Sequence, residues 1–139
     1  MISAGGKNQV VKLVYQLSDG LNIPIFVLMD RDAQQNYEEI KPKLRKKDKV
    51  HVLECGEFED ALPVKLVEKT LKDIFKNISV DKPLEKNSGM VKSLEEIFKH
   101  RGMHEFKKAD FAYMVKEHIS DISDVSDEIS QIINEIKKL

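Results

Sequence analysis

Cysteine and long apolar runs are what this chain of 139 residues has least of. Its single cysteine, Cys55, excludes an internal disulfide. Because Cys55 follows a strand-like run and has no evident His and Asn partners, we interpret it as a small buried hydrophobe and not as a nucleophile. The apolar runs are too short for a membrane span and wrongly placed for a signal peptide, so we expect a cytoplasmic protein that does not bind a membrane.

An excess of one charge is also missing. Lys and Arg number 23 against 24 Asp and Glu, which gives a net charge of -1. No global field therefore attracts nucleic acid or anionic lipid, and any site for a polyanion must be local or assisted by a metal. No internal repeat or low-complexity tract is visible. With 41% hydrophobic residues, the chain is long enough for one domain with a sizeable core.

The first half alternates strand and helix, a pattern that favours a parallel sheet with right-handed crossovers. The clearest strand is the run Ile23–Met29, whose branched apolar residues are typical of a strand buried on both faces. The elements that we expect before and after it are the end of a strand over residues 1–4, a helix over 8–17, a helix over 34–47 that Pro42 can split, and a strand over 50–53.

Polar groups follow each of these strands. They are Gly5, Gly6 and Lys7 after the first, Asp30 and Asp32 after the second, and Glu57 and Glu59 after the third. Since parallel strands all end at one edge, where open α/β sheets bind ligands, we expect these groups to converge. Carboxylates suit a hard cation such as Mg²⁺, although an Asp that caps the backbone of an ordinary turn is the alternative.

The second half is predicted to be helical. Pro63 can open one helix, and apolar periodicity predicts others over 93–100, 108–119 and about 124–139. We therefore expect residues 1–63 to form a small α/β core and residues 64–139 a helical region that packs on it.

Three further patterns each have a plain structural interpretation. The basic run over 41–49 is typical of a solvated face, with binding of a polyanion as the alternative. His100 and His104 are four residues apart but have no obvious third zinc ligand. The isoleucine stripe of the last helix is too short to argue for a coiled coil, so we expect this stripe to pack on its own domain in preference to mediating a dimer.

Three pieces of the chain, in this order and spacing, resemble the Toprim domain at the end of OLD-family ATP-dependent endonucleases. They are Ile2-Ser3-Ala4-Gly5-Gly6-Lys7-Asn8, then Ile23-Pro24-Ile25-Phe26-Val27-Leu28-Met29-Asp30-Arg31-Asp32-Ala33, then Gly56-Glu57-Phe58-Glu59-Asp60-Ala61-Leu62-Pro63. The segment 106–112 is similar to the lysine-bearing helix start of that family.

The resemblance implies a small Toprim (Rossmann-like) parallel sheet and a nuclease that uses Mg²⁺ or Mn²⁺ to hydrolyse phosphodiester bonds of DNA. Asp30 and Asp32 would be cation ligands, supported by Glu57 as a further ligand or by Glu59. Lys108 and Glu59 would be the catalytic residues, with Lys108 stabilising charge on the phosphate. Lys107 is the alternative lysine. Gly5, Gly6 and Lys7 would contact phosphate or nucleic acid.

The chain also departs from the family pattern, because it starts at what would be the second strand and lacks the first strand with its glutamate. No Gly-x-x-x-x-Gly-Lys-Ser/Thr loop occurs either, so the ATPase part is absent. We therefore expect a fragment or truncated relative that forms a homodimer or associates with an ATPase domain or partner chain.

The competing interpretation is an inactive remnant that binds nucleic acid or protein. An aspartyl-phosphate phosphatase ranks last, because Gln34 stands where that motif has Thr or Val.

Overall fold

The computed structural model describes residues 2–76, 84, 89–103 and 105–139. It is mixed α/β, with a small parallel sheet and a helical C-terminal half, as the sequence predicts. Two compact units are present, one comprising residues up to Glu57 together with Gln131–Leu139, and the other Phe58–Ser130. The expected boundary after residue 63 falls inside the second of these units. None of the described helices has the length and apolar character that a membrane crossing requires.

The sheet of the first unit has two parallel strands, β1 (Phe26–Met29) and β2 (Lys49–Val52). Val27 lies opposite Val50, and Met29 lies opposite Val52. Helix α1 (Lys7–Gly20) precedes β1. Three short helices connect β1 to β2, namely η1 (Arg31–Ala33), α2 (Gln34–Ile40) and η2 (Lys41–Lys43). Pro42 lies in η2, so α2 ends where the sequence predicts that the helix can split.

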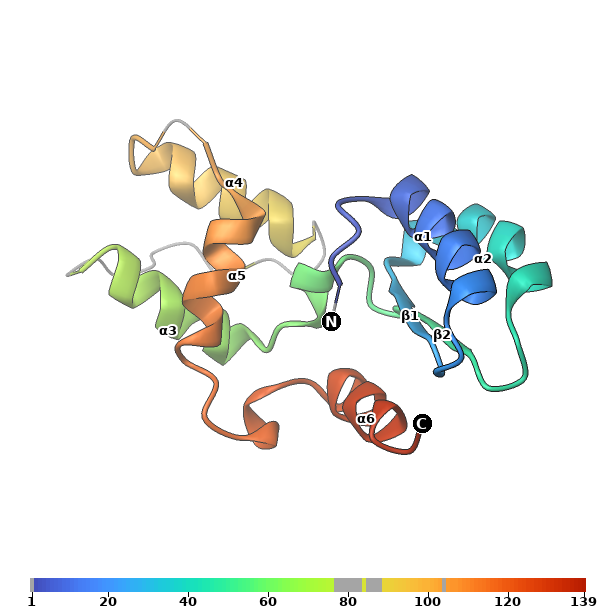
Figure 1. Cartoon of the computed structure of the whole chain (residues 1–139). Coiled ribbons are helices and arrows are strands. Elements are labelled where there is room, and N and C mark those ends of the chain that lie inside the picture. The colour runs from blue at the N-terminus through green and yellow to red at the C-terminus, as the bar shows by residue number, and fades with distance from the viewer. Residues whose placement is uncertain (1, 77–83, 85–88, 104) are drawn as a thin grey trace. The chain divides into compact units, whose positions relative to one another are not determined.

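The core of the first unit lies between its helices and its sheet. Helix α1 supplies Val11 and Val14, which are three residues apart and therefore share one face. Figure 1 shows α1 beside α2, and these helices are in contact. The other buried members of this core are Val27, Met29, Ala33 and Ile40.

The predicted strand over residues 1–4 is wrong for Ile2–Ala4, which have no regular structure, while Met1 lies outside the described residues. A strand needs a neighbour for its backbone groups, and within the described part of the chain the sheet contains β1 and β2 alone. Ile2 is 68% exposed, so burial does not favour a strand there either. The expected three-stranded sheet is therefore two-stranded.

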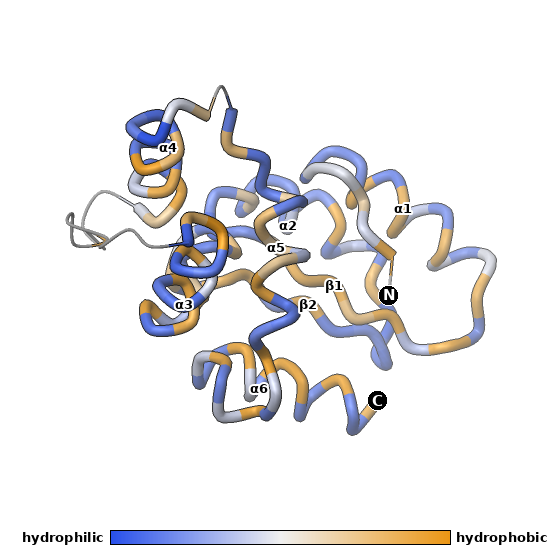
Figure 2. The backbone as a smooth tube through the Cα atoms, turned by 90° about the vertical axis from the view of Figure 1, so that its left-hand side faces the viewer, coloured by the Kyte–Doolittle hydropathy of each residue, from blue (hydrophilic) through white to orange (hydrophobic). Residues whose placement is uncertain are grey.

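The second unit is built on α3 (Val64–Ile74), α4 (Met90–His100) and α5 (Lys108–Lys116), with the short helices η3 (Phe58–Ala61) and η5 (Ile122–Asp124). Pro63 stands directly before α3, as predicted. Apolar and polar residues alternate around α3 and α4, as Figure 2 shows. Their apolar faces form the core with α5, and the buried members are Leu66, Val67, Leu71, Met90, Leu94, Phe98, Phe111 and Val115.

Phenylalanine rings order one side of this core. Phe98 meets Phe75 and Phe106 edge to face, at ring-centroid distances of 5.2 and 5.1 Å. Phe106 meets Phe111 in the same way at 5.5 Å. Such edge-to-face pairs stabilise by about 0.5–1.5 kcal/mol each beyond their area burial, so these rings fix how α3, α4 and α5 pack.

The last helix, α6 (Asp127–Ile136), follows η5. Its first turn carries Asp127 and Glu128, whose charges are favourable at a helix N-terminus. Before it, Asp121 and Asp124 form a reciprocal capping box around η5. The helix therefore starts close to the position that the isoleucine periodicity predicts.

Candidate functional site

The carboxyl ends of β1 and β2 lie at one edge of the sheet, because the strands are parallel. Directly past the ladder, Leu53 N donates to Met29 O at 2.9 Å. One step further, Arg31 N donates to Gly56 O at 2.9 Å. The turn that carries Asp30 and Asp32 is thus hydrogen-bonded to the loop that leads to Glu57.

The start of α1 reaches the same turn. Lys7 Nζ lies 2.6 Å from Asp32 Oδ2, across 25 residues of sequence. Gly5 and Gly6 precede this lysine with φ angles of +74° and +147°, which favour glycine. The structure therefore brings together Gly5, Gly6, Lys7, Asp30, Asp32 and the loop before Glu57, which the sequence predicts to converge.

Glu59 and Lys108 form a separate pair within the second unit. Glu59 lies in η3 and Lys108 begins α5, and Lys108 Nζ is 3.6 Å from Glu59 Oε2. The Glu59 side chain is only 14% exposed, so the ammonium lies beside a largely buried carboxylate. Lys107 immediately precedes α5. The two residues assigned to catalysis are therefore neighbours.

Asp60 has a structural contact that the sequence did not reveal. Its Oδ1 accepts a hydrogen bond from Met90 N at 2.7 Å, so it satisfies a donor in the first turn of α4. Asp60 and Met90 are 30 residues apart, so no local capping pattern indicates the contact.

The donor chemistry of the sheet edge suits Mg²⁺, but the carboxylates are not gathered into a complete cage. Over residues 2–76, 84, 89–103 and 105–139, no three Asp, Glu, His or Cys side chains are placed to hold one metal ion. Mg²⁺ commonly keeps several waters and takes only one or two protein carboxylates, with substrate phosphates completing its shell. Asp30 and Asp32 carry carboxylates of the kind that such a shell uses, and Asp32 pairs with the cationic Lys7.

Cys55 is exposed, so its interpretation as a small buried hydrophobe is wrong. Leu53 is the last buried residue of this run, at 1% exposure, and the chain then leaves the sheet. Cys55 Sγ lies 3.9 Å from Glu57 O in the loop that follows.

Arg45 has a structural role that the pattern of charges in the sequence did not predict. In the basic run it counts as one more solvated cation, yet it donates hydrogen bonds to Ser18 O, Leu21 O and Ile23 O. Its Nε also contacts Asp48 Oδ2 at 2.8 Å. This guanidinium therefore joins the loop before β1 to the loop before β2.

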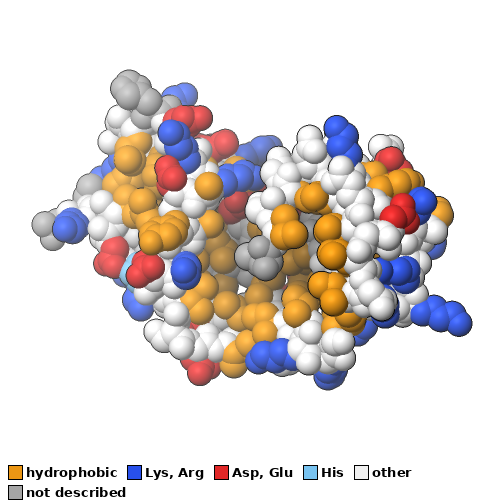
Figure 3. All heavy atoms as spheres, viewed as in Figure 1, with side chains coloured by type: hydrophobic (Ala, Val, Ile, Leu, Met, Phe, Trp, Pro, Cys, Tyr) orange, Lys and Arg blue, Asp and Glu red, His pale blue; other side chains and the backbone are white. Residues whose placement is uncertain are grey.

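Most other bases of this run also have partners. Lys47 Nζ donates to Asn22 O at 2.7 Å, Lys41 pairs with Glu38 at 3.6 Å, and Lys49 pairs with Glu135 at 3.9 Å. Lys43 Nζ lies over the ring of Tyr15 at 5.2 Å from its centroid. On the face drawn in Figure 3, Lys and Arg side chains are scattered among acidic and apolar ones. Most basic side chains of this run therefore interact with other residues of the fold, which argues against the run as a binding site for a polyanion.

Asp48 is the acid at the centre of this arrangement. Its side chain is fully buried and accepts hydrogen bonds from Ile25 N at 3.0 Å and Arg45 N at 2.9 Å. Hydrogen bonds from the Arg45 side chain, opposed by desolvation, lower the pKa of Asp48 to about 2. This acid lies at the opposite edge of the sheet from Asp30 and Asp32, just before β2, and it stabilises the fold.

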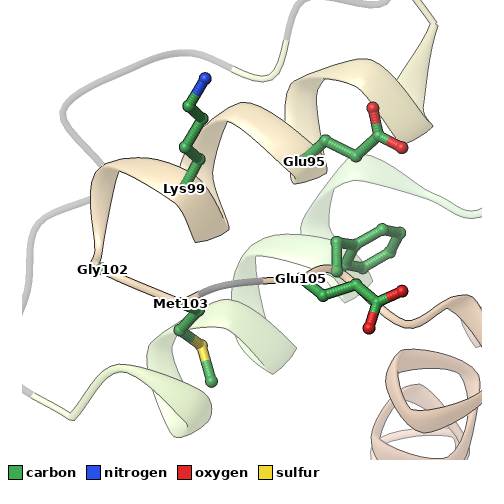
Figure 4. A pocket seen from close by; sticks show the side chains of 6 residues that line it. Glu95, Lys99, Gly102, Met103 and Glu105 are labelled. Carbon is green, nitrogen blue, oxygen red and sulfur yellow. The ribbon is translucent and has the colours of Figure 1, made fainter.

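A hollow of about 670 Å³ lies in the second unit, at the end of α4. Figure 4 shows Glu95 and Lys99 on α4, with Met103 and Glu105 on the chain that follows. The hollow is also lined by Gly102 and Phe106, and it includes none of the predicted site residues. His100 is exposed at the end of α4, and His104, its candidate zinc partner, lies outside the described residues.

No protein-family model matches this chain, and it matches no curated protein and no solved structure. The Toprim resemblance and the activity that it implies therefore stay predictions.

Proposed function

We propose that this chain is a Toprim-type domain, related to those of OLD-family endonucleases, that binds Mg²⁺ or Mn²⁺ and hydrolyses phosphodiester bonds of DNA. The observation that carries the proposal is the convergence at one sheet edge, where Arg31 N bonds Gly56 O at 2.9 Å and Lys7 Nζ lies 2.6 Å from Asp32. Open α/β sheets bind ligands at the carboxyl ends of their strands, and these acids lie at that edge.

Each group at this edge has a chemical role in the proposal. Asp30 and Asp32 hold the cation, and Glu57 supports them. The bound cation supplies Lewis acidity that activates water and neutralises charge on the phosphate. Lys7 and the backbone of Gly5 and Gly6 are available to a phosphate at the same edge, since among the described residues nothing beyond the chain neighbours lies within 4 Å of either glycine's Cβ position.

Glu59 and Lys108 would act as a pair in the proposed reaction. The Lys108 ammonium, 3.6 Å from Glu59, offers further donors to a phosphate oxygen. We also propose the cytoplasm as the location, and a second copy or an ATPase domain as the partner.

One observation favours the alternative, an inactive remnant that serves as a binding module. Within the described residues no three Asp, Glu, His or Cys side chains are placed to hold one metal ion, and the Asp32 carboxylate forms an ion pair with Lys7. A remnant would keep the fold of the edge without cleaving nucleic acid. Binding through the basic run is the less favoured form of this alternative, because Arg45 and Lys47 are committed to backbone carbonyls.

Cation binding separates the two functions. We would titrate the full chain with Mg²⁺ and with Mn²⁺, and follow binding by calorimetry and by backbone NMR shifts. For the wild type we expect shifts centred on Asp30 and Asp32, and for Asp30→Asn with Asp32→Asn at least about tenfold weaker binding, because the hard anionic ligands are gone. DNA cleavage assays in the presence of each metal follow.

The matched control is Asp19→Asn, which removes one exposed carboxylate from the other end of α1. It should bind the cation as the wild type does. If neither metal binds at millimolar concentration, the autonomous nuclease is excluded and the remnant is favoured. Binding without cleavage would favour a domain that needs a partner for activity.

A further inference from the structure

The Lys7–Asp32 ion pair occupies a carboxylate that the proposed function assigns to a cation. We infer that Lys7 competes with the divalent cation for Asp32: it holds the carboxylate when no cation is bound, and its ammonium turns to phosphate when one binds. This inference rests on the proposed function, because it assigns a regulatory role within the same site.

Lys7 is positioned for this role by the start of α1. It is the first residue of that helix, and its half-exposed side chain reaches Asp32. Beside it, Asn36 Nδ2 donates to Asn8 Oδ1 at 3.1 Å, which ties the same turn of α1 to α2. Two neighbouring contacts therefore hold the first turn of α1 against the segment that carries Asp32.

The ammonium and the divalent cation compete for Asp32 Oδ2. An ammonium 2.6 Å from Oδ2 fills the space that a metal ion and its bound waters would need around that oxygen. A divalent cation interacts more strongly than a single ammonium with the same carboxylate, and it repels the ammonium in turn. Exchange of one cation for the other is therefore the expected consequence of metal binding.

Exposure makes this contact easy to exchange. The Lys7 side chain is 48% exposed and that of Asp32 is 72% exposed. An ion pair as exposed as this one shifts an equilibrium by no more than about fivefold, which a divalent cation can overcome. Lys7 thus tunes the cation affinity and does not block the site.

The released ammonium remains near the bound cation, since the backbone of α1 does not need to move. A lysine is a compact point charge that binds phosphate oxygens well. Lys7 would therefore contact phosphate only after the cation is bound, which orders the two events.

The test measures cation affinity in variants of Lys7, with Mn²⁺ and Mg²⁺ themselves as probes and calorimetry as the readout. For Lys7→Met we expect the dissociation constant to fall by about two- to fivefold, because a competing and repelling charge is removed. Lys7→Arg keeps the charge and should stay within about twofold of the wild type. Lys12→Met, an exposed lysine of the same helix, controls for net charge and should change the affinity little.

NMR gives a readout that does not depend on activity. The Lys7 Cε and Nζ resonances should shift in step with those of Asp32 as the cation is added. If the cation binds and Asp30→Asn with Asp32→Asn abolishes binding, but Lys7→Met leaves the affinity unchanged, the inference is wrong and the proposed function survives. If no variant binds a cation, both are wrong.

Discussion

Arg45, which the sequence predicts to lie on a solvated basic face, forms structural hydrogen bonds together with Asp48. Arg45 serves backbone carbonyls of Ser18 and Ile23, while Asp48 accepts from Ile25 N. Each group satisfies polar backbone atoms just before a strand begins. Since a buried carboxylate costs free energy unless it is fully bonded, removing either partner should be more damaging than the loss of an ordinary surface ion pair.

We predict that Asp48→Asn lowers the free energy of unfolding by roughly 2–4 kcal/mol at neutral pH. Because the folded-state pKa of Asp48 is lowered to about 2, the carboxylate contributes stability above its ordinary pKa near 4. That contribution is lost as the pH falls from about 4 through about 2, so the variant's stability should depend less on pH in this window. Urea unfolding at several pH values measures both effects.

Lys46→Ala is the control for this prediction, because Lys46 is exposed in the same segment. A surface change of this kind should alter stability by less than about 0.5 kcal/mol. An Asp48→Asn variant as stable as Lys46→Ala would show that the pair contributes no net stability.

At the scale of the element, the apolar residues along one face of α6 and the chain that follows it differ in how far they are buried. Ile132 is 3% exposed, whereas Ile136, one turn later, is 47% exposed and Leu139 is 41% exposed. The isoleucine stripe is therefore not uniformly packed. Its buried position should contribute most of the stability that this helix adds.

We predict that Ile132→Ala lowers the free energy of unfolding by about 2–4 kcal/mol, since it removes a fully packed side chain and leaves a cavity. Ile136→Ala makes the same chemical change at a half-exposed position and should cost less than about 1 kcal/mol. Urea unfolding of the two variants compares them directly. Equal losses would indicate that Ile136 is also buried in solution, as in a dimer, and concentration dependence would then reveal the second copy.

At the scale of the whole molecule, the described residues form two separate hydrophobic cores. The first contains β1, α1 and α2, and the second contains α3, α4 and α5. Each core is formed by residues of a single unit. Since units with their own cores can open separately, we expect the two to differ in their protection against hydrogen exchange.

We predict that Leu94→Ala, at a fully buried position of the second core, costs about 2–5 kcal/mol in that unit. Amide protection should fall first in α3, α4 and α5, while the amides of β1 and β2 keep theirs. Native-state hydrogen exchange read by NMR measures this residue by residue. A uniform loss across both units would show that the chain unfolds as one cooperative structure.

The sequence by itself determined the local elements of this protein. Helical periodicity predicted α1, α3 and α4, Pro63 marked the start of α3, and the branched run before Asp30 predicted β1. These signals are local, because a 3.6-residue period or a fixed proline φ acts on neighbours in the chain. Parallel pairing of β1 and β2 followed from the helix between them, and with it the edge where Asp30 and Asp32 lie.

Only the tertiary structure decided which side chains meet. Ile2–Ala4 pairs with no strand of the described sheet. Just before β1, which begins at Phe26, Ile23 O accepts a hydrogen bond from Arg45 and Ile25 N donates one to Asp48. The contacts of Lys7 with Asp32 and of Asp60 with Met90 span 25 and 30 residues. No periodic pattern records such partners, because they depend on where the folded backbone carries each side chain.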